Sequence, residues 1–177
     1  MNTGNLSEDA RQRARNHHAQ GLNCAESTLR GVLEVLREEG VTDVSLEATL
    51  LASGLGGGIG GSGATCGALI GASMAIGTVH GRKDPYALAT FEERRDQLNG
   101  PEGLYRVFNN LVHDFKKTMG TTSCAELTCP YDYRSEERKQ FCRNIIGDGA
   151  ALAVAWTIRA LEEGYRLPYR YNIMGDK

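Results

Sequence analysis

Five cysteines are the residues of this chain whose type best suits redox or metal chemistry. Cys66 follows a glycine-rich run within the stretch LASGLGGGIGGSGATCGALIG, which covers residues 51–71. In a reducing compartment, cysteines are metal ligands or redox thiols more often than parts of a disulfide framework, and an odd number of them fits that interpretation. The sequence therefore predicts a thiol site to which a glycine-rich turn presents Cys66. The five are Cys24, Cys66, Cys124, Cys129 and Cys142.

Three of the cysteines stand where helices are expected to begin. Cys24, Cys66 and Cys124 each follow a residue that can cap a helix, in the order Asn23, Thr65 and Ser123. The positive end of the helix dipole and the free N–H groups at a helix start lower the pKa of a thiol. We therefore expect these three thiols to ionise readily. Cys142 is expected inside a helix, between basic neighbours.

The glycine-rich run also has the outward form of two other features. Residues 56–61 match the GxGxxG fingerprint of dinucleotide sites, but that motif needs a preceding strand, and here a helix is expected. Residues 48–79 contain no charge, yet the glycines within 54–63 would break a membrane-spanning helix. We therefore expect neither a nucleotide site nor a membrane span. Gly67 and Gly71 are expected to face a neighbouring helix instead.

Apolar residues recur at helical spacing along most of the chain, and no alternation lasts long enough to predict a sheet. A chain of 177 residues, 41% of them hydrophobic, suits one domain with a substantial core. We expect an all-α, single-domain helical bundle over residues 1–177, with an irregular tail at 165–177. The expected helices are Leu6–Gln20, Cys24–Glu39, one opening at Ser45, Cys66–Val79, Ala87–Leu98, Leu104–Phe115, Ser135–Ile146 and a last apolar one through Val154, Trp156, Ile158 and Leu161.

Charge and composition bear on location and partners. The net charge is −2, so the chain has no electrostatic basis for binding nucleic acid or an anionic membrane. The first 20 residues contain no apolar run, so no signal peptide is predicted and a cytoplasmic location is expected. The irregular tail could wrap around a second subunit, and we expect a homodimer.

Several other residues that can carry chemistry have ordinary structural interpretations. His17 and His18 are expected to be solvated on a polar helix, and His113 is expected to be exposed. His80 is expected to cap the end of its helix, where a histidine interacts favourably with the dipole. Asp148 is expected to cap the start of the last helix. None of these five residues is assigned to the thiol site.

The cysteine-bearing segments resemble a known family as a set. The segments GLNCAESTLRGVLEVL, LASGLGGGIGGSGATCGALIGASMAIG, SCAEL and FCRN follow in the order of the redox-active C-GCAxxG-C-C family, and the resemblance runs from about Ala14 to Leu161. Its most specific block is Cys-Gly-Ala-x-x-Gly, which begins here at Cys66. The resemblance assigns the four signature cysteines to Cys24, Cys66, Cys124 and Cys142, and it leaves Cys129 outside the pattern as a possible accessory.

The resemblance implies redox function, because the family is thought to be redox-active and its genes often lie near transport genes. A related module occurs in split-Soret cytochromes, which carry an iron–sulfur centre besides their haems. This chain has no Cys-x-x-Cys-His motif, so no haem is expected. We expect the four cysteines to bind an iron–sulfur cluster for electron transfer with an electron-transfer or membrane-transport partner. The alternatives are a thiol–disulfide oxidoreductase, with Cys66 and Cys124 as candidate redox thiols, and a structural metal protein.

Overall fold

Seven α-helices and two 3₁₀ helices build the molecule in the computed structural model, which describes residues 2–175. No β-strand occurs in that range, so the prediction of an all-α fold is confirmed. None of the helices within it has the length and apolar character that crossing a membrane requires. In chain order the elements are α1 (Thr3–Ala19), α2 (Cys24–Glu38), η1 (Leu46–Leu55), α3 (Gly67–His80), η2 (Pro85–Ala87), α4 (Phe91–Asn99), α5 (Tyr105–Met119), α6 (Cys124–Thr128) and α7 (Glu136–Glu163).

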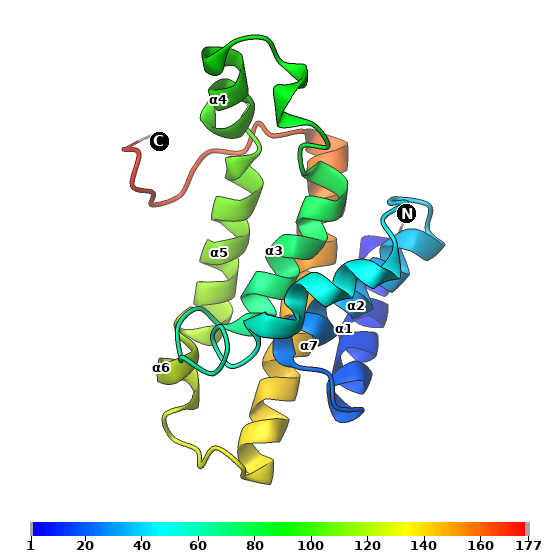
Figure 1. Ribbon diagram of the computed structural model, residues 1–177, viewed down its shortest axis with the longest axis vertical. Helices are drawn as coiled ribbons and strands as arrows, with labels where there is room; N and C mark the ends of the chain where they lie inside the picture. The colour runs from blue at the N-terminus through cyan, green and yellow to red at the C-terminus, as the bar shows by residue number, and fades with distance from the viewer. Residues whose placement is uncertain (1, 176–177) are drawn as a thin grey trace.

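The longest helix, α7, is the axis on which the other large helices pack (Figure 1). It contacts α1, α2, α3 and α5, and α2 also packs on α1 and α3. In Figure 1, α3 and α5 run along the length of the molecule, while α1 and α2 lie at its side. The lower end in that view brings together α6, the glycine-rich loop after η1 and the first turns of α7.

Helix α2 illustrates how local sequence signals build the core. The Asn23 side chain accepts hydrogen bonds from the N–H groups of Ala25 and Glu26, and the Glu26 carboxylate accepts one from the Asn23 N–H. This reciprocal capping box satisfies N–H groups that the first helical turn would leave unpaired. Leu29 and Leu33 lie one turn apart on the apolar face and are fully buried. Burial of each contributes about 1.5–3 kcal/mol.

Helix α7 replaces two helices that the sequence predicts as separate. The expected boundary falls near Gly147, Asp148 and Gly149, and the expectation that Asp148 caps a helix start is wrong because it lies inside α7. The glycine here serves close packing, since a Cβ atom at Gly147 would lie 2.6 Å from Nε of Arg15. Asp148 forms an ion pair with Nε of Arg11 at 3.2 Å. Contact with α1 therefore explains this glycine–aspartate segment.

Most other element boundaries lie close to the predictions. Helix α5 continues to Met119, beyond the predicted end at Phe115. The segment that Ser45 caps forms the 3₁₀ helix η1 rather than an α-helix. Helix α4 begins at Phe91 instead of Ala87, because Thr90 and Glu93 form a capping box at that point.

The C-terminal tail is irregular as predicted, and it packs on α5 of its own chain. The Asn110 side-chain amide donates to the carbonyl of Pro168, and that of Asn109 donates to the carbonyl of Tyr171. Nε2 of His113 lies 2.8 Å from the same Tyr171 carbonyl. The prediction that His113 is exposed is therefore wrong, because the tail half-buries it. Residues 176 and 177 of the predicted tail lie outside the described residues.

His80 ends α3 as expected, but it is buried, and its two ring nitrogens are used in the core rather than at the helix end. Nε2 lies 3.0 Å from the carbonyl of Thr157, and Nδ1 lies 3.0 Å from the hydroxyl of Tyr165. A neutral ring satisfies both contacts when Nε2 carries the proton and Nδ1 accepts from the tyrosine. Burial lowers the pKa of His80 below its ordinary value of 6.5, and the Thr157 contact opposes this only partly.

We predict that His80 makes the protein less stable in mild acid. Because its pKa is depressed in the folded state, its contribution is complete above the unfolded value of 6.5 and is lost as the pH falls below it. The free energy of unfolding, measured with urea, should be lower at about pH 5.5 than at about pH 7.5. His80→Gln should flatten this dependence, and an unchanged slope in that variant would contradict the assignment. His18→Gln should also flatten the dependence in part, because burial lowers the pKa of His18 as well.

Candidate cysteine site

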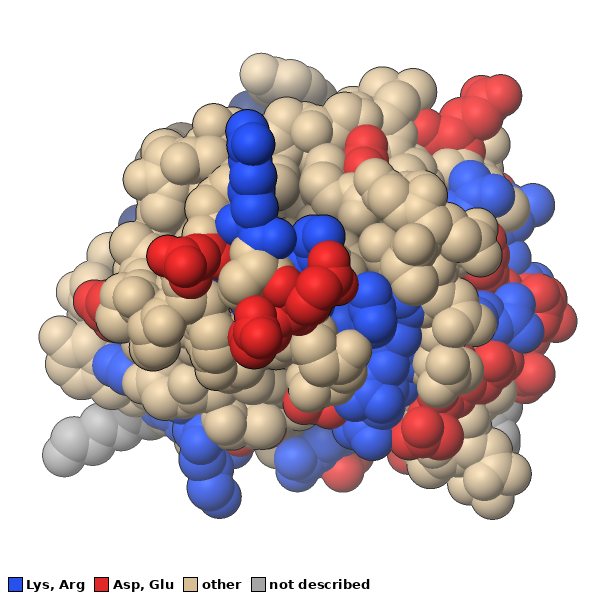
Figure 2. Space-filling view, turned by 90° about the horizontal axis from the view of Figure 1, so that it is seen from below, with Lys and Arg blue, Asp and Glu red and all other residues tan. Residues whose placement is uncertain are grey.

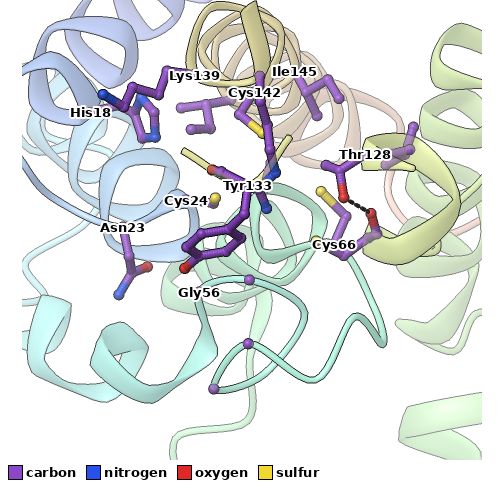
Figure 3. A pocket seen from close by; sticks show the side chains of 18 of the residues that line it. His18, Asn23, Cys24, Gly56, Cys66, Thr128, Tyr133, Lys139, Cys142 and Ile145 are labelled. Carbon is purple, nitrogen blue, oxygen red and sulfur yellow. Dashed lines mark hydrogen bonds between the residues drawn. The ribbon is translucent and has the colours of Figure 1, made fainter. Parts of the chain in front are cut away.

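Four of the five cysteines line one cavity of about 350 Å³ at the lower end of the molecule (Figure 3). They come from four separate elements: Cys24 begins α2, Cys66 precedes α3, Cys124 begins α6, and Cys142 lies in α7. All four are free thiols, with Cys66 and Cys124 buried and the other two half-buried. Cys129 is exposed and lies outside the lining of the cavity. The fold thus brings the four signature cysteines to one place and separates the fifth.

Burial dominates the acidity of Cys24, Cys66 and Cys142. It raises the pKa of Cys66 to about 12, with the neighbouring Cys24 and Cys124 adding to the effect. It raises the pKa of Cys142 to about 11, and it also raises the pKa of Cys24. A buried thiol resists ionisation because the thiolate loses the stabilisation that water provides. Without a positively charged ligand, these three thiols are therefore protonated at neutral pH.

The helix starts act in the direction that the sequence predicts, but their effect is the smaller one. At the start of α3, the backbone N–H groups of Ala68 and Leu69 lower the pKa of Cys66, and at Cys24 the backbone N–H of Gly57 in the glycine-rich loop and that of Cys24 itself act in the same direction. In both cases burial outweighs them, so the prediction that Cys66 and Cys24 ionise readily is wrong for the protein without a ligand. The sequence shows which residues begin helices, but it does not show how deeply their side chains are buried.

A short backbone pairing holds the Cys66 and Cys124 segments side by side. The N–H of Cys66 donates to the carbonyl of Thr122 at 2.8 Å, and the N–H of Cys124 donates to the carbonyl of Ala64 at 2.7 Å. These bonds surround an isolated antiparallel bridge between Thr65 and Ser123. The pairing makes Cys66 the N-cap of α3, so the helix begins one residue later than predicted.

The glycine-rich loop passes too close to its neighbours to carry side chains at two points. Gly58 has a φ of 72°, and a Cβ atom there would lie 2.6 Å from the Ala64 nitrogen and 2.8 Å from Cβ of Cys124. A Cβ atom at Gly63, whose φ is 78°, would lie 3.0 Å from Cβ of Ala125. Positive φ and close backbone approach both require glycine here. The loop therefore forms one wall of the cavity and packs directly on α6.

The side of the cavity that faces α1 and the start of α7 carries basic and aromatic groups that the sequence did not assign to the site. They are His18, Tyr133, Arg138 and Lys139. The guanidinium of Arg138 lies 4.5 Å from the centre of the Tyr133 ring, and its Nη1 donates to the Tyr133 carbonyl at 3.1 Å. Figure 3 shows His18 and Lys139 near each other at one side of the cavity, with Tyr133 across the view.

The sequence predicts that the two adjacent histidines of α1 are solvated. In the structure both are half-buried instead. His17 pairs with Glu34 of α2, with Nε2 3.0 Å from the carboxylate. His18 is half-buried in the cavity wall, and its Nδ1 is buried without a hydrogen-bond partner among the residues that the structure describes. Burial lowers the pKa of His18, and the positive charges of Arg143 and Arg138 lower it further. Only the packing of α1 on α7 reveals this position, whereas the spacing of Arg138 four residues before Cys142 was visible in the sequence.

The donor atoms of the cavity are four thiols from four separate elements. Among residues 2–175, no three His, Cys, Asp or Glu side chains are arranged to hold a single ion. The four thiols instead line the wall of a cavity. An iron–sulfur cluster takes four thiolates, which need not be close in sequence, and each bonds to a different part of the cluster. Four thiolates are the donor set of an iron–sulfur cluster and also of a structural zinc ion.

These features define a class: an all-helical protein with one cavity lined by four free cysteines from four elements. The chain belongs to the family described as "Putative redox-active protein (C_GCAxxG_C_C)", whose model matches residues 22–156, most of the chain. The family resemblance read from the sequence is confirmed. Comparisons with curated proteins and with solved structures gave no match.

Proposed function

We propose that this protein binds an iron–sulfur cluster in the cysteine cavity and transfers electrons. The observation that carries the proposal is the convergence of Cys24, Cys66, Cys124 and Cys142 from four elements on one cavity. These four side chains would hold the cluster, which supplies one-electron chemistry when it is bound. The activity is proposed for the cytoplasm, in a homodimer, with an electron-transfer or membrane-transport protein as partner.

The remaining residues of the cavity support such a site in two ways. The backbone of the glycine loop lines the cavity directly. The backbone N–H groups that face Cys24 and Cys66 favour the ionised form of those thiols. Arg138 and Lys139 place positive charge beside four groups that become negative when they bind a metal. Leu127, Ile145 and the buried Ile146 form apolar parts of the lining and limit access of water.

A thiol–disulfide oxidoreductase is the second candidate, and two observations favour it. The described part of the chain has no group of three donors set for a metal ion, and the backbone pairing keeps Cys66 and Cys124 in neighbouring segments. Such chemistry needs a thiolate as nucleophile. The raised pKa of Cys66 opposes this at neutral pH. We therefore rank this candidate below the cluster.

Purification under strict anaerobic conditions separates the two candidates. We predict that the protein will contain iron and acid-labile sulfide in comparable amounts and will show visible absorption that bleaches on reduction. Metal analysis and an absorption spectrum measure this directly. Protein that contains no iron or sulfide, also after anaerobic reconstitution with both, would refute the cluster. Loss of two titratable thiols on mild oxidation would then favour the oxidoreductase.

A further inference from the structure

We propose that the basic side of the cysteine cavity is a binding subsite for small carboxylates. Arg138 and Lys139 of α7 form it, beside His18 of α1. The inference goes beyond the proposed cluster, because the subsite consists of side chains other than thiols and is present whether or not the thiols hold metal.

The cavity is lined by positively charged side chains, whereas the whole protein has a small net negative charge. The chain has 22 acidic and 20 basic residues, yet the cavity lining includes Arg138 and Lys139 and no aspartate or glutamate. Figure 2 views the molecule from below, and it shows lysine and arginine side chains gathered near the middle of this end, with acidic groups beside them. A concave site whose charged side chains all have the same sign attracts ligands of the opposite charge. The cavity is therefore selective for anions.

Arg138 has hydrogen-bonding capacity that the protein does not use. Its guanidinium donates to the Tyr133 carbonyl and stacks over the Tyr133 ring. Among the ion pairs of the described chain, none involves Arg138. A guanidinium offers five N–H donors in a planar fork that matches a carboxylate. The ring and the carbonyl of Tyr133 hold this fork in place.

Lys139 and His18 complete the subsite. Lys139 pairs with Glu136 at 2.5 Å, but both side chains are largely exposed, and Glu136 does not line the cavity. Such an exposed pair contributes little stability, so an incoming anion can compete for the ammonium group. His18 lines the same wall, where its Nδ1 is enclosed by the surrounding residues and has no hydrogen-bond partner within residues 2–175. A carboxylate near Arg138 therefore has additional polar groups within the same wall.

The size and lining of the cavity define the class of ligand. A volume of about 350 Å³ is within the range of small-molecule sites. Cys24 and Cys142 are half-buried, and they line the same space as the basic groups. A small carboxylate held by Arg138 would therefore place the rest of its atoms against the thiols.

Alkylation with two reagents that differ in charge tests this proposal. Full-length protein, reduced and treated with a chelator, is reacted with iodoacetate, a carboxylate, and separately with iodoacetamide, its neutral analogue. Mass spectrometry gives the rate at each cysteine, and the exposed Cys129, outside the cavity, is the internal reference. We expect the ratio of iodoacetate to iodoacetamide rates to be roughly 3- to 10-fold higher at Cys24 and Cys142 than at Cys129, in keeping with electrostatic attraction into a cleft.

Three variants assign the effect to the subsite. Arg138→Gln should bring the ratio close to that at Cys129, whereas Arg138→Lys should keep only part of the preference, because the charge remains but the planar fork is lost. Arg134→Gln is the matched control, since Arg134 is exposed and does not line the cavity. Lys139→Gln should lower the ratio in part, and it provides a second test if Arg138→Gln fails to fold.

Two results would overturn the subsite. One is an equal ratio of iodoacetate to iodoacetamide rates at all cysteines in the unchanged protein. The other is an equal decrease of that ratio in Arg134→Gln and Arg138→Gln, which would indicate only the general electrostatic potential of the protein surface. Unreactive propionate, added at constant ionic strength, should slow iodoacetate at Cys24 more than it slows iodoacetamide. These rates are measured on metal-free protein, so a failure of the subsite proposal can be distinguished from a failure of the cluster proposal, which depends on the iron and sulfide content.

Discussion

Replacing Cys66 by serine should abolish both metal binding and the redox response, whereas replacing Cys129 by serine should preserve most of each. Cys66 is buried in the cavity wall, between the glycine loop and the start of α3. A serine hydroxyl is a poor substitute for a thiolate ligand, and it cannot take part in thiol redox chemistry. Cys129 is exposed at the end of α6, and its thiol donates to the Glu126 carbonyl. Side-by-side metal content and thiol titration of the two variants measure the difference.

The Cys66→Ser variant should still fold, so that loss of function reports on the site. Cys66 occupies the N-cap position of α3, where serine is among the preferred residues. The N–H groups of Ala68 and Leu69 that face the sulfur could donate to a serine hydroxyl. We therefore expect a thermal midpoint close to that of the unchanged protein. If Cys129→Ser loses as much metal and redox response as Cys66→Ser, the assignment of four signature cysteines is wrong for this chain.

The parts of the fold that depend on local signals could be predicted from the sequence. The capping box of Asn23 and Glu26 places the start of α2 at Cys24, as the residue types indicate. The family pattern selects the four cysteines that line the cavity and leaves out Cys129. Such signals lie within a few residues of the position that they determine, so no knowledge of the packing is needed.

The features that the sequence could not predict all depend on contacts between distant segments. His18 was expected in solvent because its own helix is polar, but the approach of α7 half-buries it in the cavity wall. Asp148 has the residue type of a cap, yet Arg11 of α1 pairs with it inside a continuous helix. The pKa of Cys66 was expected to fall at a helix start, and burial by the surrounding elements raises it instead. In each case a local preference is outweighed by tertiary burial.

The second large effect is expected at Gly71, where α3 packs on α2. The sequence predicts this glycine to face another helix, and a Cβ atom there would lie 2.5 Å from the carbonyl oxygen of Ala25 and 2.9 Å from Cβ of Thr28. The first of these is a backbone atom of a well-capped helix, so it cannot move aside cheaply. Gly71→Ala should therefore lower the free energy of unfolding by roughly 1–3 kcal/mol, and Gly71→Leu by at least as much.

Gly77 of the same helix is the matched control, because a Cβ atom there would have nothing within 4 Å. Gly77→Ala should stabilise the protein by up to about 1 kcal/mol, since alanine favours the helix and meets no obstacle. Urea unfolding of both alanine variants measures the contrast, and equal effects would refute the packing role of Gly71. The clash also bears on the site, because a Cβ atom at the neighbouring Gly67 would lie 3.1 Å from Cβ of Cys24. A separation of α3 from α2 in Gly71→Leu should therefore move Cys66 away from Cys24 and reduce the metal content of the folded protein.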